Sequence, residues 1–395
     1  MLFVQIIIFF YIFFLMTIPI DYRISDTRSL KSFNKKTFGN FLVKDVVNAF
    51  NKALMTCKLE ESCNWAVELL ISGLFDKFWD KVFSIFLKNI NINNPNLPFF
   101  IYKRYSKFLV YYRKYDNKLE LRNNQVIRNM FCEICCVLCS SVKLKSIGFS
   151  KIENKDFNMG YLSTKMKADS NKYVSDKIKY GDPNELNIIM NEFNYNLVTK
   201  NYELSSYWMS WVFEFEKKNT SKNKTYICAY REIDGIDTKF KHDICWFFWE
   251  ILIKEAQNKD EDFKNNIESL FKLYKNEFKP SKKSKKNYLL LLAVKYFTDI
   301  YKFSNKLIGD YSVLIQATSN INNIFINKIN GEVNKYKDYN EKKKYEDNVP
   351  VIKKENEVKK KKEELKKLKE IADLKMKHKI STVEKIDSLI LNGKI

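Results

Sequence analysis

Residues that form tight turns or bind metals are scarce in this chain, since its 395 residues include 9 Gly, 6 Pro and 2 His. All-β and doubly wound folds need many tight turns, so this scarcity argues against both classes. No two glycines lie closer than Gly148 and Gly160, which excludes a glycine-rich phosphate loop. His242 and His378 lie too far apart to build a histidine-rich metal site, and they argue against a Ser-His or Cys-His nucleophile.

The apolar residues that are present recur at intervals of three and four, which is the spacing of amphipathic helices. At 45% hydrophobic residues, the chain is long enough to bury a substantial core. We therefore predict a mainly α fold of two multi-helix lobes, with a solenoid-like stack of helices as a variant of it. Helices are expected over about 43–91 with a break near Gly73, 102–115, 125–142, 183–199, 203–217, 240–257, 260–277 and 287–303. A short hairpin is expected over Tyr226 to Ile236, around Asp234-Gly235.

Composition shifts divide the chain into five segments. These are an apolar leader (1–20), an N-terminal helical lobe (21–149), a linker (150–182), a C-terminal helical lobe (183–330) and a Lys-rich tail (331–395). The tail is expected to be a charged helix or disordered, because its heptad spacing of apolar residues covers only two heptads.

The leader has two interpretations. Residues 2–20 are uncharged, apolar and about long enough to cross a bilayer, as an anchor or signal peptide would be. However, no basic residues precede this run and no small-residue cleavage site follows it. We favour the alternative that translation begins at Met16 and that the upstream run is A/T-rich DNA read in frame.

The net charge of the chain is +22, and residues 331–395 contribute +6 of it, which leaves +16 on residues 1–330. A surplus of this size favours anionic partners, such as nucleic acid or a membrane surface. The alternative is that the basicity reflects genome composition, because Lys, Asn, Ile, Phe and Tyr have codons rich in A and T. Both readings stay open at this stage.

The first candidate binding segment is a cluster of five lysines, Lys279, Lys282, Lys283, Lys285 and Lys286, just before an apolar helix. Free backbone N–H groups and the positive end of the helix dipole would add to the lysine charge, so the cluster is a candidate phosphate contact. A solvated linker is the alternative.

The second candidate segment interleaves aromatic residues with cations over 102–128. The candidate contacts among its cations are Lys103, Arg104, Arg113, Lys114, Arg122 and Arg128. Aromatic rings between cations could stack single-stranded bases while the cations neutralise phosphate. The more frequent pattern is an amphipathic helix with Tyr and Phe inward and Lys and Arg outward, and we favour it.

A run of four cysteines, Cys132, Cys135, Cys136 and Cys139, invites a metal-site interpretation. Their spacing instead puts all four sulfurs on one stripe of a helix, which cannot wrap a metal tetrahedrally. We therefore favour core packing.

The carboxylates Glu232, Asp234 and Asp237 lie around a turn and could hold magnesium, but solvated turn acids are the favoured interpretation. We name no catalytic residue, metal ligand or cofactor.

Several short strings are specific as a set, namely Asp21-Tyr22-Arg23, Thr27-Arg28, Cys63-Asn64-Trp65-Ala66, Ile71-Ser72-Gly73, Asn93-Asn94-Pro95-Asn96-Leu97-Pro98, Leu121-Arg122-Asn123-Asn124, Ile127-Arg128 and Tyr207-Trp208 with Trp211. Together they resemble an uncharacterised protein family of giant viruses, the mimivirus-like nucleocytoplasmic large DNA viruses. The resemblance covers about residues 21–328. It implies viral origin, a start near Met16 and a place in host cytoplasm or a viral factory, and it brings no catalytic residue.

The leading hypothesis is a non-enzymatic helical binding or scaffold protein that contacts nucleic acid or nucleoprotein in viral replication or packaging. One alternative is a membrane-anchored or virion structural protein, which requires the leader to be translated. The other alternative is a metal-dependent enzyme of unfamiliar type, built on the three turn carboxylates.

Overall fold

The computed structural model describes residues 23–24, 26, 28–221, 227–303 and 306–346. The predicted leader (1–20) and the heptad segment of the tail lie outside the described residues. The chain divides into two compact units, residues 1–329 and 330–395.

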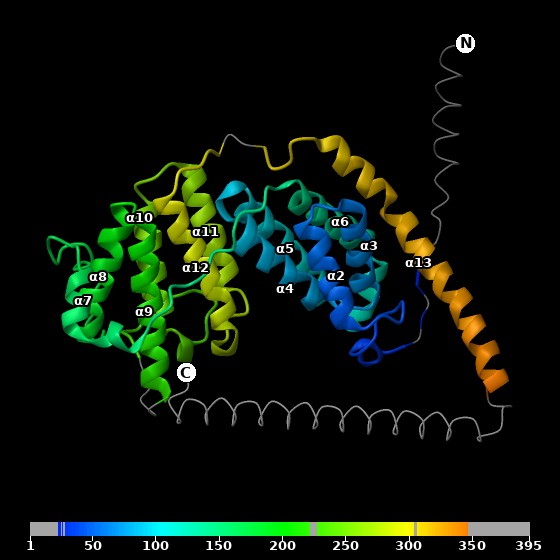
Figure 1. Cartoon of the computed structure of the whole chain (residues 1–395), viewed down its shortest axis with the longest axis horizontal. Coiled ribbons are helices and arrows are strands. Elements are labelled where there is room, and N and C mark those ends of the chain that lie inside the picture. The colour runs from blue at the N-terminus through cyan, green and yellow to red at the C-terminus, as the bar shows by residue number, and fades with distance from the viewer. Residues whose placement is uncertain (1–22, 25, 27, 222–226, 304–305, 347–395) are drawn as a thin grey trace, which may run out of the picture. The chain divides into compact units, whose positions relative to one another are not determined.

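Helices make up all the regular structure that the described ranges contain, apart from one isolated bridge between Lys36 and Leu42. The prediction of a mainly α fold is therefore confirmed. The first group of helices (Figure 1, blue to cyan) comprises α2 (Val43–Met55), α3 (Leu59–Ile71), α4 (Phe75–Ile85), α5 (Leu97–Lys114) and α6 (Gln125–Ser140). These helices share a core of large aromatic and aliphatic residues, in which Phe78 stacks on Phe131 with ring centroids 3.8 Å apart.

The second group (Figure 1, green to yellow) also consists of amphipathic helices packed around an aromatic core. It comprises α7 (Met159–Lys165), α8 (Asn184–Val198), α9 (Tyr202–Ser221), α10 (Cys245–Ala256), α11 (Glu261–Lys275) and α12 (Lys283–Thr298). Polar caps fix some helix starts, as where the Asp260 carboxylate accepts a hydrogen bond of 2.9 Å from the backbone N–H of Phe263. The last described helix is α13 (Tyr311–Glu346), which begins before the predicted end of the second lobe.

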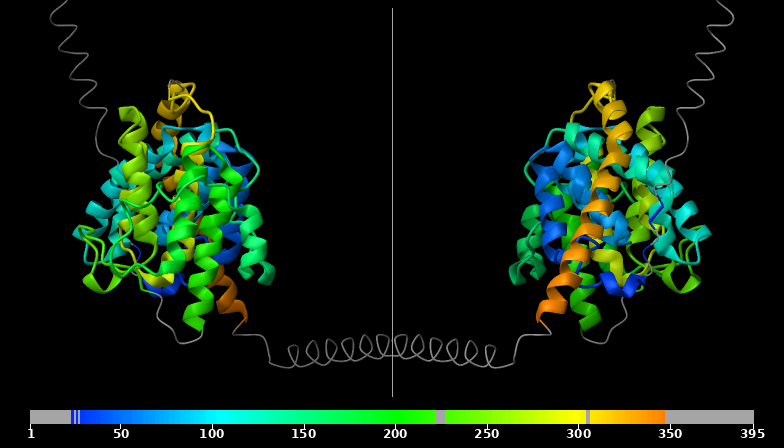
Figure 2. Two further views of the ribbon diagram at one scale, coloured as in Figure 1. Left: turned by 90° about the vertical axis from the view of Figure 1, so that its left-hand side faces the viewer. Right: turned by 90° about the vertical axis from the view of Figure 1, so that its right-hand side faces the viewer.

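The two groups meet along α5 and α11, which pack against each other. The turn over residues 93–98 lies at this contact, because the carbonyl of Pro95 accepts hydrogen bonds from Asn266 on α11 and from Tyr296 on α12. Figure 2 shows the molecule from its two sides, with the second group (green to yellow) nearer the viewer on the left and the first group (blue to cyan) nearer on the right. The turn over residues 93–98 therefore helps to join the two groups.

The segment predicted as a linker, 150–182, is bound to α8 and α9 at several points. The Trp211 indole donates a hydrogen bond of 2.7 Å to the carbonyl of Asp156, and the Tyr207 hydroxyl donates one of 2.8 Å to the Asp156 carboxylate. Further along, the Glu192 carboxylate accepts hydrogen bonds from the backbone N–H groups of Lys167 and Ala168. The segment contains α7 and is part of the second group of helices.

The hairpin predicted over Tyr226 to Ile236 is wrong. Residues 227–236 form no strand, although the chain does turn at Asp234-Gly235, where Gly235 has a φ of +77°. The segment instead bonds to the residues just before α10, with Cys228 N–H donating to the His242 carbonyl and Arg231 N–H to that of Lys241. The segment that accepts these bonds is only a few residues long, between two helical segments, so no ladder of strand hydrogen bonds forms.

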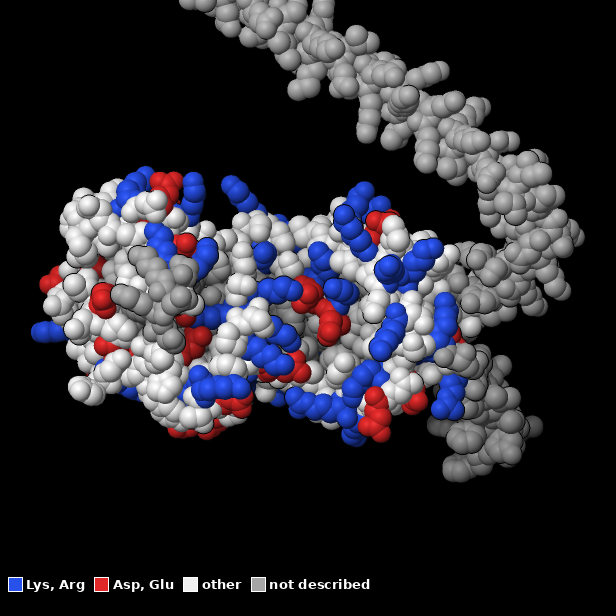
Figure 3. Space-filling model, turned by 90° about the horizontal axis from the view of Figure 1, so that it is seen from below, with Lys and Arg blue, Asp and Glu red and all other residues white. Residues whose placement is uncertain are grey.

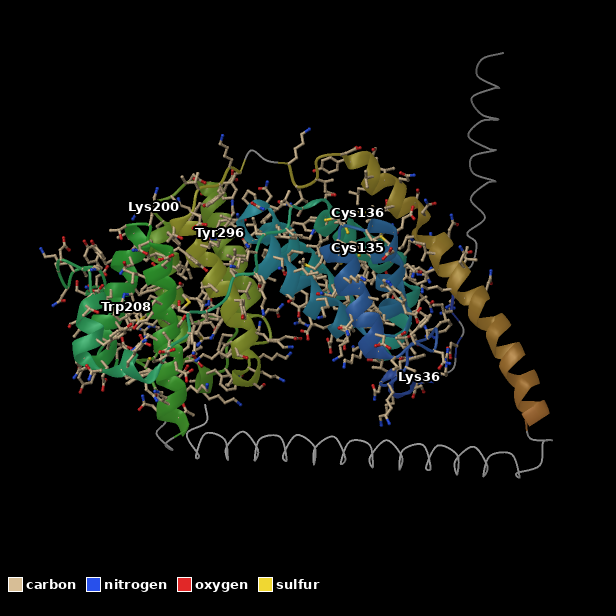
Figure 4. All side chains as sticks on the ribbon, in the orientation of Figure 1. Lys36, Cys135, Cys136, Lys200, Trp208 and Tyr296 are labelled. Carbon is tan, nitrogen blue, oxygen red and sulfur yellow. The ribbon has the colours of Figure 1, made fainter. Side chains whose placement is uncertain are left out.

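All four cysteines of the predicted stripe are buried on α6, as the packing interpretation expected. Figure 4 labels Cys135 and Cys136 within the first group of helices. Cys63 on α3 faces the same stripe, with its Sγ 3.5 Å from that of Cys132. Burial raises the pKa of Cys135 and Cys139 to about 11, which keeps them as thiols at neutral pH.

No helix in the described part of the chain is long and apolar enough to cross a membrane.

Candidate nucleic-acid interface

A pocket of about 660 Å³ opens where the two groups of helices meet. One wall is α4, the following helical turn η2 (Phe86–Ile90) and α5, and the other is the end of α11 and the start of α12. Seen from below, lysine and carboxylate side chains gather around a hollow near the middle of this face (Figure 3). Because it joins charged and aromatic side chains, we call it the lysine–tyrosine pocket.

Positive charge predominates in the pocket lining. The lining cations are Lys77, Lys81, Lys88, Lys282, Lys285 and Lys286, and the lining acids are Asp76, Asp80 and Glu277. Lys285 Nζ lies 2.8 Å from the Asp80 carboxylate, and Lys282 Nζ lies 3.7 Å from that of Glu277. All four partners are exposed, so these ion pairs are worth little and an anionic ligand could replace them at small cost.

Aromatic rings form the floor and sides of the pocket. Those in the lining are Trp79, Phe83, Tyr105, Phe108, Tyr112 and Tyr288. Burial and the carboxylates of Asp76 and Glu277 raise the pKa of Tyr112, and the same influences act on Tyr105. Both phenols therefore stay neutral and can donate hydrogen bonds in the neutral pH range. Lys88 Nζ lies 4.0 Å above the ring of Tyr288, so cation and ring already alternate here.

The predicted lysine cluster divides into two sets in the structure. Lys279, Lys282 and Lys285 are exposed, and the last two line the pocket. Lys283 and Lys286 turn inward and make hydrogen bonds within the protein. At most three of the five lysines are thus available to a partner.

Lys286 caps the C-terminal end of α11. Its Nζ donates hydrogen bonds of 2.6 to 2.9 Å to the carbonyls of Leu273, Tyr274 and Asn276. Burial and the neighbouring Lys282 lower the pKa of Lys286 to about 8, while the three carbonyl acceptors favour the protonated amine. The main role of Lys286 in the pocket wall is therefore structural.

Lys283 joins α12 to two acids elsewhere in the second group. Its Nζ lies 2.6 Å from a carboxylate oxygen of Glu216 on α9 and 2.6 Å from one of Asp243, just before α10. Burial would lower the pKa of Lys283, but the two carboxylates raise it above the ordinary value. This lysine holds the start of α12 in place and points away from the pocket.

The cations of the second candidate segment also separate by location. Lys103, Arg113 and Lys114 are exposed on α5, but none lines the pocket. Arg104 makes two hydrogen bonds of 2.5 Å to the Glu133 carboxylate on α6. The pattern that we favoured from the sequence, with aromatic residues inward and cations outward, describes this helix.

Arg122 and Arg128 are buried, at 3% and 1% exposed, so neither can meet a large partner at the surface. Arg128 donates from Nε to the carbonyl of Arg122, and its guanidinium lies 4.1 Å from the ring centroid of Phe325 on α13.

Sequence reasoning missed the lysines of α4 and η2, namely Lys77, Lys81 and Lys88. A signal for two of them was present, because Lys77 and Lys81 are four residues apart and so share a face of α4. That signal pointed to an exposed helix face, and only the fold shows that this face lies opposite the start of α12.

Two of the three turn carboxylates are paired with lysines. Glu232 pairs with Lys241 and accepts a hydrogen bond of 2.8 Å from the Tyr230 hydroxyl, and Asp237 lies 3.7 Å from Lys239. Among the residues that the structure describes, no group of three or more His, Cys, Asp or Glu is placed to hold a metal ion.

The comparisons with known proteins identify no relative: no family model, no curated protein and no solved structure matches this chain.

Proposed function

We propose that this protein is a non-enzymatic binding protein whose lysine–tyrosine pocket takes single-stranded nucleic acid. The observation that carries the proposal is that two segments, each a candidate from its own composition, contribute to one pocket. Lys282 and Lys285 come from the lysine cluster, and Tyr105 and Tyr112 come from the aromatic segment about 170 residues earlier.

Single strands fit this pocket better than a duplex for two reasons. Stacking on tyrosine requires an unpaired base, whose faces are covered in a duplex. The volume of about 660 Å³ also suits one or two nucleotides. Exposed lysines at the rim would contact the phosphates on either side of a stacked base.

We propose that the two groups of helices are two lobes of a solenoid-like array, since α5 of one packs against α11 of the other. The setting in viral replication or packaging, in host cytoplasm or a viral factory, is proposed on the resemblance of the short strings alone.

Adjacent tyrosines on α5 give a matched test of the stacking role. Tyr112 lines the pocket and Tyr111 does not, although both are half-buried on the same helix. Because base–aromatic stacking is worth about 1–3 kcal/mol per base, we expect Tyr112→Leu to weaken single-strand binding about tenfold or more. Tyr111→Leu should bind like the wild type. Fluorescence anisotropy with labelled single-stranded oligonucleotides measures both, after circular dichroism has confirmed the fold.

Equal affinities of the two leucine variants would show that Tyr112 does not take part in binding. A preference for duplex over single strand in the wild type would contradict the stacking geometry itself.

A further inference from the structure

A second pocket, of about 550 Å³, lies in the first group of helices and shares no lining residue with the lysine–tyrosine pocket. It is formed between residues 23–24, 26 and 28–30 on one side and the helical turn η4 (Lys118–Asn123) on the other. Three of its lining residues are arginines, Arg23, Arg28 and Arg122. We call it the arginine pocket. Two acids, Asp26 and Glu120, also line it, so its charged residues sum to a net positive charge.

The walls of the arginine pocket are fixed by hydrogen bonds between distant segments. The Asn123 side chain accepts a hydrogen bond of 2.8 Å from the N–H of Ile24 and donates one of 3.3 Å to its carbonyl. Nearby, Gly73 has a φ of +69°, and a Cβ on it would lie 2.6 Å from Leu30 and 2.9 Å from Leu119. This close approach of three segments requires glycine, and it brings the segment before α2 against η4.

Arg122 is the unusual member of this pocket. Within the described residues its side chain donates to two neutral acceptors, from Nη1 to the carbonyl of Ile71 at 3.2 Å and from Nη2 to that of Asp26 at 3.0 Å. Its Nε is buried and has no hydrogen-bond partner within the described structure. Burial lowers the pKa of Arg122, and Arg28 adds to this while Asp26 opposes it.

Asp26 acts on the Arg122 guanidinium through its charge, but it makes no ion pair with it. Asp26 makes its ion pair with Arg28, at 2.6 Å, and no described carboxylate lies within 4.0 Å of Arg122. A buried cation with no carboxylate in direct contact is costly, and a bound anion would offset part of that cost.

We propose that the arginine pocket binds a phosphate group. Guanidinium groups match phosphate oxygens in pairs, and three of them line one concave site. Neutral donors from Ser29, Asn117 and Asn123 also line it. Its volume exceeds what inorganic phosphate alone would fill, so the phosphate can belong to a small organic monoester such as a nucleotide.

Thermal unfolding of the full chain in a buffer free of phosphate tests this site. Sodium phosphate should raise the melting temperature in a saturable way, and sodium chloride at matched ionic strength should not. Arg122→Met, which removes the charge and keeps the bulk, should abolish the phosphate-specific rise. Arg23→Gln removes the charge of an exposed wall residue, so the variant should still fold and its phosphate concentration at half-effect should rise about tenfold.

Two further arms define what is bound and where. Adenosine monophosphate in place of inorganic phosphate asks whether the phosphate is recognised alone or as part of an ester, and a saturable rise with either one supports the site. Lys285→Ala should respond to phosphate like the wild type, which separates this site from the lysine–tyrosine pocket. The same response of wild type and Arg23→Gln, or no saturable response to either ligand, would overturn the proposal.

Discussion

Replacing Arg231 by leucine is expected to lower the free energy of unfolding by about 3–5 kcal/mol, because it leaves a buried carboxylate without its counter-charge. Arg231 is 1% exposed and donates two hydrogen bonds of 2.9 Å to the Asp182 carboxylate. Its Nε donates a third, of 2.7 Å, to Glu250. The Asp182 side chain is fully buried. Urea unfolding followed by circular dichroism measures the loss.

The pH dependence of this variant gives an independent check. Burial would raise the pKa of Asp182, but Arg231 lowers it below its ordinary value. The pair therefore stabilises the wild type above about pH 4, and that stability is lost as the pH falls through the lowered pKa of Asp182. Without Arg231 the buried carboxyl favours protonation, so the difference between variant and wild type should shrink from pH 7 towards pH 4.

An exposed ion pair serves as the control for Arg231. Lys58 and Glu61 lie 2.7 Å apart with both side chains more than half exposed. Lys58→Ala should change the free energy of unfolding by less than about 1 kcal/mol. A comparably small effect of Arg231→Leu would show that the buried pair does not hold the 150–182 segment to α10.

Replacing Lys283 by methionine is the second change with a large expected effect. It leaves the carboxylates of Glu216 and Asp243 facing each other near the start of α12, and the expected loss of stability is again about 3–5 kcal/mol. Burial already raises the pKa of Glu216, with Lys283 opposing that rise. Adding Glu216→Gln to the Lys283 variant should therefore recover part of the loss, as the same urea titration would show.

The Lys283 variant also separates structural from binding lysines in the cluster. At a temperature where it remains folded, Lys283→Met should bind single-stranded nucleic acid as the wild type does, because its Nζ points away from the lysine–tyrosine pocket. A loss of affinity in the folded variant without a loss of stability would contradict this assignment.

The helices were predictable because their cause is local. Apolar residues at helical spacing gave α8 and α11 to within a residue or two of the observed bounds, and the scarcity of glycine left few other breaks. The hairpin prediction failed because the segment that bonds to residues 227–236 is only a few residues long, between the helical turn Thr238–Phe240 and α10. Pairing partners of that kind depend on tertiary packing, which local patterns do not contain.

The candidate site was predictable only in part. Composition singled out Lys282 and Lys285, but the same composition singled out Lys283 and Lys286, and only packing shows that these two are held by acids and carbonyls. The arginine pocket was even less predictable from the sequence. Arg28 and Arg122 fall in two of the strings that carry the resemblance, but they are 94 positions apart and nothing in either string indicates that they meet.

The salt dependence of single-strand binding tests the central claim most directly, through two matched double variants. Lys282→Ala with Lys285→Ala removes two exposed, ion-paired lysines from the lysine–tyrosine pocket. Lys151→Ala with Lys217→Ala removes two exposed, ion-paired lysines elsewhere, so the net charge of the two variants is equal.

Each phosphate that a single strand loses as a contact reduces the slope of log affinity against log salt by about 0.7. The pocket variant should therefore show a slope flatter by about 1.4 and a weaker affinity, while the control keeps the wild-type slope. Equal slopes for both variants would contradict the account, because the attraction would then belong to the net charge of the protein and to no particular site.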